Sequence, residues 1–167
     1  MWVEGLRRHL ADLRDNKYEG AAGRDREAKY RAAFDLLGPL ALGVLKDMNA
    51  LLLAGSGEVS QSDPASDGDG GLIGSWQLSW PQLARARHRM TGQALLPVTV
   101  SAVFPAGFVH PHLVPGGRVQ PGAASLVAWP MQVASAADAS QYRQLLWALA
   151  TEEMHDRIYQ SSWQIIP

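Results

Sequence analysis

A stripe of apolar residues at alternating spacings of four and three runs through residues 24–54. Its members are Tyr30, Phe34, Leu37, Ala41, Val44, Met48 and Leu51. This spacing is that of the a and d positions of a heptad repeat, so it predicts a long helix with one seam turned toward a partner helix. We therefore expect these residues to form an interface between copies of the chain, in a helical hairpin or coiled-coil arm.

The second half of this predicted helix is apolar on most of its surface. Of the 19 residues from Leu36 to Ala54, 13 are apolar, and such a helix is buried on most sides. The run is long enough to span a bilayer, but Lys46 and Asp47 lie inside it, and charged side chains are costly at the bilayer centre. Burial against protein is therefore favoured, and the C-terminal domain, a second copy of the chain or another protein could supply the cover. Gly38-Pro39 predicts a kink or a break.

In the rest of the chain, the spacing of apolar residues predicts shorter helices and strands. A helix over 2–15 precedes the long helix, and the glycine-rich residues 55–71 predict a flexible linker. Strands are predicted over 72–80, 95–104, 108–114 and 124–133, with a short helix over 81–90 and a final helix that starts at Ser135 or Asp138 and ends near Trp163. We expect an α+β fold: a helical arm (1–54), a linker (55–71) and a small mixed α+β head with a C-terminal helix (72–167).

The charged residues are distributed unevenly along the chain. The net charge is −1 and 19% of all residues are charged, close to the average of about 25%. Between Asp69 and Asp138, however, there is no Asp, Glu or Lys and there are only four arginines. We expect this segment to be covered on several sides. The near-neutral total charge of the chain gives no reason to expect a nucleic-acid partner.

The charge-poor segment has the composition of a protein interface. Tryptophan and arginine are enriched at interface hot spots, whereas Lys, Glu and Asp are depleted there. We therefore expect the head to dock onto a larger protein complex. The candidate contact residues are Trp76, Trp80, Arg85, Arg89, Phe104, Phe108 and Trp129.

A pair of histidines supplies the alternative interpretation. His110 and His112 point to the same side if their segment is extended, and His155, together with Glu152 and Glu153, could add further ligands. Such a set suits zinc or non-haem iron in a small metal-dependent enzyme or metal-binding domain. The simpler interpretation is that of two hydrogen-bonded loop histidines, since Pro111 can turn the chain and separate the rings.

The sequence favours a non-enzymatic accessory subunit over this alternative. It contains no phosphate-binding loop, no nucleophile elbow and no zinc-protease helix, and it has no cysteine, which excludes disulfides and thiolate metal sites. We expect a scaffold for complex assembly that forms homo-oligomers, binds a larger complex and needs no cofactor. Charged residues interrupt any apolar run near the N-terminus, so we expect a cytoplasmic protein, with a membrane surface as a further candidate contact.

Overall fold

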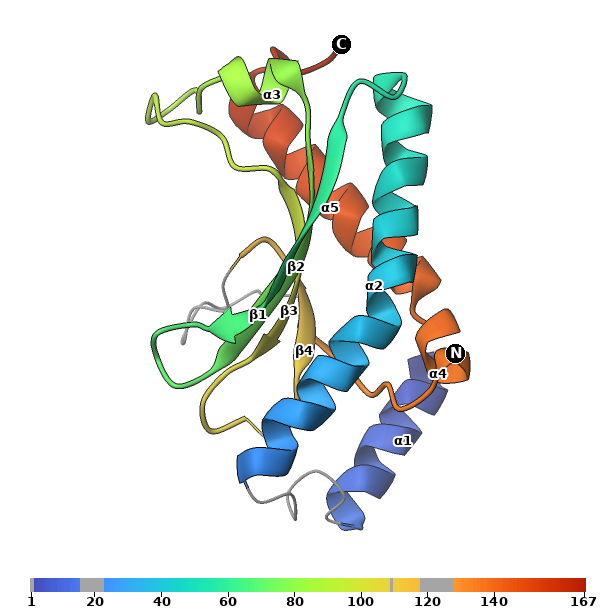
Figure 1. The fold of residues 1–167 in the computed structure, drawn as a ribbon. Helices are drawn as coiled ribbons and strands as arrows, with labels where there is room; N and C mark the ends of the chain where they lie inside the picture. Colours follow the sequence, from blue (N-terminus) through green and yellow to red (C-terminus); the bar gives the residue numbers. More distant parts are fainter. Residues whose placement is uncertain (1, 16–22, 109, 118–127) are drawn as a thin grey trace.

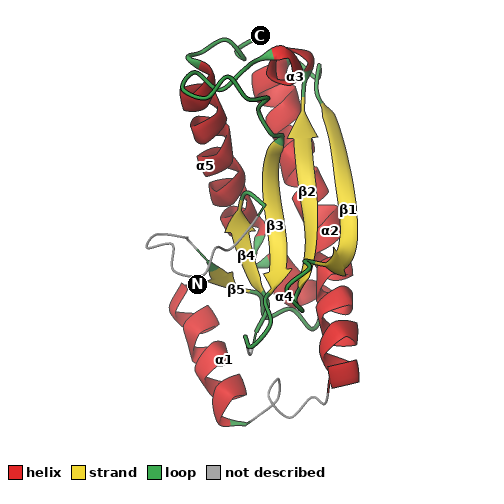
Figure 2. Cartoon of the chain, turned by 90° about the vertical axis from the view of Figure 1, so that its left-hand side faces the viewer, coloured by secondary structure: helices red, strands yellow, loops and turns green. Residues whose placement is uncertain are grey.

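The computed structural model describes residues 2–15, 23–108, 110–117 and 128–167. Its five-stranded antiparallel sheet has the order β1-β2-β3-β4-β5 (Figure 2). The strands are Glu58–Ser66 (β1), Leu72–Ser79 (β2), Val98–Phe104 (β3), His112–Pro115 (β4) and Trp129–Pro130 (β5). The helices are Trp2–Arg14 (α1), Gly23–Leu53 (α2), Pro81–Arg85 (α3), Ala136–Ser140 (α4) and Arg143–Ser161 (α5). The predicted α+β class, with a long N-terminal helix and a C-terminal helix, is confirmed.

The two long helices cover one face of the sheet (Figures 1 and 2). α2 packs against β1 and β2, and α5 packs against β3 and β4. Successive residues of a strand point to opposite faces, so Trp76 and Leu78 of β2 and Val98 and Val100 of β3 point toward the helices and are buried. One hydrophobic core therefore lies between the sheet and these helices.

The apolar stripe of α2 faces the core of its own chain. Six of its seven residues, all but Leu51, are at most 2% exposed within the chain itself. They belong to the core of the chain itself, in which α2 packs on β1, β2, α4 and α5. The ring of Phe34, for example, stacks on that of Trp76 with 4.4 Å between the ring centroids. The predicted oligomer interface along this stripe is wrong, because a helix that packs on a sheet needs the same apolar face as a helix that packs on a helix.

α2 runs through Gly38-Pro39 without a break. Pro39 lies on the exposed side, whereas a Cβ on Gly38 would lie 3.2 Å from Oε1 of Gln61. That oxygen accepts a hydrogen bond from the indole of Trp76, so the glycine allows a close approach of helix and sheet. Among the described residues, α2 is the one helix long and apolar enough to cross a membrane, and much of its apolar surface lies in the core.

The segment predicted to be a flexible linker contains a strand. β1 pairs with β2 from Glu58 opposite Ser79 to Ser66 opposite Leu72, with an irregularity after Ser62. The prediction is wrong because β1 is an edge strand with mostly exposed residues, and such a strand needs few apolar side chains. Since α2 and the sheet contribute to one core, the predicted arm and head are not separate units.

The other predicted elements are found with changed bounds. The strands over 72–80, 95–104 and 108–114 correspond to β2, β3 and β4, and the helix over 81–90 stops at Arg85. Of the strand over 124–133, residues 124–127 lie outside the described residues and two later ones form β5. The last helix is divided into α4, capped by Ser135, which is one of the two predicted start residues, and α5.

Candidate functional site

Helix α1 is attached to the rest of the protein by polar side chains. Arg8 Nη1 donates to Asp138 Oδ1 at 2.6 Å, and Gln132 Nε2 donates to Asp12 Oδ2 at 3.1 Å. Of the α1 side chains that the structure describes, which are those of residue 3 and residues 6–14, none belongs to the hydrophobic core. The helix is therefore held at the edge of the protein, below the sheet in Figure 1.

The apolar flank of α1 is largely exposed. The exposed fractions of Val3, Leu6 and Leu10 are 71%, 57% and 51%. On a helix, residues three and four apart share a face, so these three side chains form one stripe. An amphipathic helix of a globular protein usually turns such a stripe toward the core. α1 instead turns Arg8 and Asp12 toward α4 and the segment before it.

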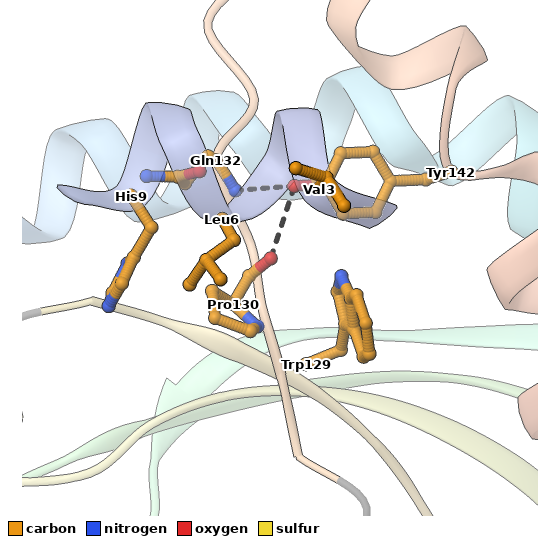
Figure 3. Close-up of a pocket in the computed structure, with 7 residues that line it drawn as sticks. All are labelled: Val3, Leu6, His9, Trp129, Pro130, Gln132 and Tyr142. Carbon is orange, nitrogen blue, oxygen red and sulfur yellow. Dashed lines mark hydrogen bonds between the residues drawn. The ribbon is translucent and has the colours of Figure 1, made fainter. Parts of the chain in front are cut away.

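An apolar pocket of about 310 Å³ lies between this flank and β5. Figure 3 shows Val3, Leu6 and His9 pointing from α1 toward the segment that begins at Trp129. The lining residues are Val3, Leu6, His9, Trp129, Pro130, Gln132 and Tyr142. Ligand pockets typically measure 300–1,000 Å³ and have mostly apolar walls with a few polar groups. This pocket is therefore at the small end of that range.

Tyr142 fixes the far wall of the pocket. Its hydroxyl accepts a hydrogen bond from the backbone N–H of Gln132 at 2.9 Å and donates to the carbonyl of Pro130 at 3.1 Å (Figure 3). Burial raises the pKa of Tyr142, so the hydroxyl remains a donor at neutral pH. The wall is thus built into the fold.

Three histidines meet where α1 contacts the end of the sheet. The ring centroids of His9 and His110 lie 4.4 Å apart, and His112 at the start of β4 packs edge-on against Phe108. Burial, assisted by the charge of His9 and opposed by that of Asp12, lowers the pKa of His110 to about 4. Burial also lowers the pKa of His112, so these two rings are neutral at pH 7.

The metal site predicted from His110, His112 and His155 is not assembled. His155 lies on the exposed side of α5 and lines a different, open surface cavity with Trp147 and Tyr159. In the part of the chain that the structure describes, no group of three or more His, Asp or Glu side chains could hold a metal ion. The prediction fails because the sequence does not show which face of α5 packs on β4.

Three of the seven residues predicted to bind a partner lie in the core. Trp76, Trp80 and Phe104 are at most 3% exposed, so they cannot contact another protein without unfolding. Tryptophan is as useful for filling a core as for an interface, and its presence in the sequence does not separate the two. Trp129 is half-buried and lines the pocket.

The remaining three are at the surface. Phe108 is partly exposed beside His112. Arg85 and Arg89 are exposed as well, although α3 ends at Arg85 and they do not share a helix face. The guanidinium of Arg89 lies 4.1 Å from the centroid of the Tyr159 ring, rather than in an ion pair with the acidic residues of α5.

A buried ion pair on α5 is not evident from the sequence. Glu153 Oε2 and Arg157 Nη2 are 2.8 Å apart, with both side chains 7% exposed. Glu153 also accepts from the backbone N–H of Thr99, and Arg157 Nε donates to the carbonyl of Leu96. These bonds satisfy the buried charges and fasten the start of β3 to α5. The spacing of four residues between Glu153 and Arg157 was the available signal.

Comparisons with protein-family models, with curated proteins and with solved structures give no match for this chain. The pocket beside α1 and the exposed surfaces are therefore interpreted from their own chemistry.

Proposed function

We propose that this chain is a non-catalytic protein-binding subunit, and that its partner is a larger protein with an apolar segment that docks between α1 and β5. We call this site the α1 groove: the stripe of Val3, Leu6 and Leu10 together with the pocket wall of Trp129 and Pro130. The observation that carries the proposal is the orientation of α1. Its polar side chains hold the helix against the rest of the protein, and its apolar flank is exposed.

The spacing of the stripe suits a helical partner segment. Val3, Leu6 and Leu10 stand at i, i+3 and i+7, the anchor spacing by which amphipathic helices recognise apolar surfaces. A partner helix beside α1 would cover this stripe and place one side chain in the pocket. The polar atoms of His9 and Gln132 at the wall would then border the contact.

The small area of the exposed stripe on α1 favours a different protein as the partner over a second copy of this chain. A stable interface buries roughly 800 Å² of each partner, and three exposed side chains of a 13-residue helix supply only part of that area. Two copies that meet flank to flank could bury little more. A larger partner can bring its own apolar surface around the groove.

Site-specific cross-linking tests the proposal. The sequence has no cysteine, so Leu10→Cys introduces the single attachment point for a photoactivatable cross-linker. Leu51→Cys, on a leucine in the last turn of α2 that is exposed as well, is the matched control. In extract from the native organism, we expect one protein to be cross-linked from position 10 and not from position 51.

The captured protein must then bind through the groove in purified form. We expect the double variant Leu6→Glu/Leu10→Glu to lose at least about ten-fold in affinity, since each large apolar side chain contributes about 1.5–3 kcal/mol when fully buried. Leu51→Glu should bind as the unmodified chain does. A cross-linked product of two copies of this chain, or equal affinity in all variants, would overturn the proposal.

A further inference from the structure

Exposed apolar side chains gather at the end of the molecule opposite α1. Figure 1 shows the last turn of α2, α3 with the loop that follows it, and the C-terminus at this upper end. The large apolar residues of these segments that are more than half exposed are Leu51, Leu52, Met90, Leu96, Trp163 and Ile166. We call this set the apical surface; it shares no residue with the α1 groove.

Three arginines stand among these apolar residues. Arg85, Arg87 and Arg89 are exposed, and within the described ranges none of them pairs with a carboxylate. Their printed hydrogen bonds go to nearby backbone carbonyls, as from Arg85 Nε to Pro81 O at 3.1 Å. Since residues 70–137 contain no acidic residue, the positive charge is not balanced within the segment that carries it.

The loop that carries these residues has a fixed conformation. His88 donates its N–H to the carbonyl of Gln93, and its Nδ1 accepts from the N–H of Met90 and of Thr91. The N–H of Arg89 donates to the carbonyl of Gln160 at the end of α5. Met90, 80% exposed, is therefore held outward at the tip of an ordered turn.

The C-terminal segment is fixed in the same way. The indole of Trp80 donates to the carbonyl of Ile165 at 2.7 Å, and the side chain of Ile165 is fully buried in the core. Its neighbours Trp163 and Ile166 are thereby held at the surface. An apolar side chain that is exposed on an anchored segment, rather than on a frayed end, is available for binding without further ordering cost.

We infer that the apical surface binds the surface of an anionic lipid bilayer. Arginines attracted to acidic headgroups, with Trp, Met, Leu and Ile at the level of the acyl boundary, are the combination that holds peripheral proteins at such an interface. The apolar residues protrude from three separate segments, so they can enter a fluid layer together. A nucleic acid would use the arginines but leave the aliphatic side chains in water.

Vesicle flotation tests this inference with the full chain. We expect the protein to float with phosphatidylcholine vesicles that contain phosphatidylserine, and to remain in the soluble fraction with phosphatidylcholine alone. Each Arg→Gln change at position 85, 87 or 89 should lower the partition coefficient about five-fold, which corresponds to about 1 kcal/mol per arginine near an anionic surface. Added salt should weaken binding, because it screens exposed charges.

A second set of variants tests the contribution of the apolar side chains to vesicle binding. Met90→Glu and Leu51→Glu should each lower binding to the acidic vesicles, whereas Leu10→Glu, in the α1 groove, should leave it unchanged. The fluorescence of Trp163 should shift to shorter wavelength on binding, and Trp163→Phe should remove that shift. All these positions are exposed, so the variants are expected to fold.

Two outcomes would overturn the inference. One is equal flotation with neutral and acidic vesicles, or none with either. The other is binding to a double-stranded DNA fragment that depends on the three arginines while Met90→Glu and Leu51→Glu have no effect. The test is independent of the α1 groove: vesicle binding that Leu10→Glu spares stands even when no protein is captured at position 10.

Discussion

At the scale of single residues, the helix layer depends on one close contact between α2 and β2. The ring of Phe34 lies over the backbone of Gly74 and stacks on Trp76 with an interplanar angle of 10°. A Cβ on Gly74 would lie 2.6 Å from Cε2 of Phe34, closer than atoms approach in practice. The glycine is therefore required by the space that the ring occupies.

Gly74→Ala should destabilise the protein by about 1–3 kcal/mol, the usual cost of overpacking a core. Chemical denaturation measures this change. The matched control is Gly43→Ala within α2, where an added Cβ meets nothing within 4 Å. That substitution should instead stabilise the protein by up to about 1 kcal/mol, because alanine favours the helix. Equal effects at the two positions would refute the packing argument.

His110 should make the protein sensitive to acid. Its side chain is 1% exposed, and burial lowers its pKa to about 4, whereas the unfolded chain has a histidine pKa of about 6.5. As the pH falls below about 6.5, the unfolded state takes up a proton that the folded state does not. Stability should therefore decline until about pH 4, by about 3 kcal/mol in total.

The pH dependence of urea unfolding measures this effect in the unmodified chain and in His110→Asn. The variant should lose less stability over the same range, with a remainder from His112, whose pKa is shifted in the same direction. An identical decline in both proteins would show that the acid sensitivity arises elsewhere.

At the scale of elements, α1 differs from the other long helices in how it is held. α2 and α5 contribute apolar side chains to the core, whereas α1 relies on Arg8, Asp12 and the ring contact of His9. Partly exposed ion pairs contribute at most about 1 kcal/mol. α1 should therefore be able to open locally while the sheet and its two helices stay folded.

Arg8→Ala should increase amide hydrogen exchange across α1 by up to about five-fold, the equivalent of about 1 kcal/mol. The amides of α2 and α5 should keep their protection. Arg31→Ala, which removes an exposed pair with Glu27 on α2, is the control and should leave α1 unchanged. Loss of protection in α2 together with α1 would contradict the idea that α1 opens separately. Hydrogen exchange followed by mass spectrometry resolves these segments.

Sequence patterns identify the elements of this protein better than their packing. The seam from Tyr30 to Met48 correctly locates α2 and its buried face, but heptad spacing does not distinguish a sheet from a partner helix. The sequence pattern does not predict β1, because an edge strand rich in Ser and Gln has the same polar composition as a flexible linker. The α1 groove cannot be predicted from the sequence either. An apolar stripe such as Leu6 and Leu10 predicts a buried flank, and only the tertiary structure shows that this flank is exposed.

At the scale of the whole molecule, two surfaces of different chemistry lie at opposite ends. The α1 groove is apolar and lies beside histidines that burial keeps neutral at pH 7. The apical surface combines three arginines with protruding apolar side chains. A subunit with this arrangement could hold a protein at one end while the other end rests on a membrane, and each end can be disabled without touching the core between them.

The labelling rate of a thiol at position 6 tests the central claim, that the α1 groove is open in the free protein and filled by a partner. Leu6→Cys and Leu51→Cys each give a single exposed thiol. In the purified protein both should react with a maleimide at similar rates. Extract from the native organism, cleared of membranes so that the apical surface stays free, should slow the reaction at position 6 and leave position 51 unchanged. A slow reaction at position 6 in the purified protein, or no effect of the extract there, would contradict the account.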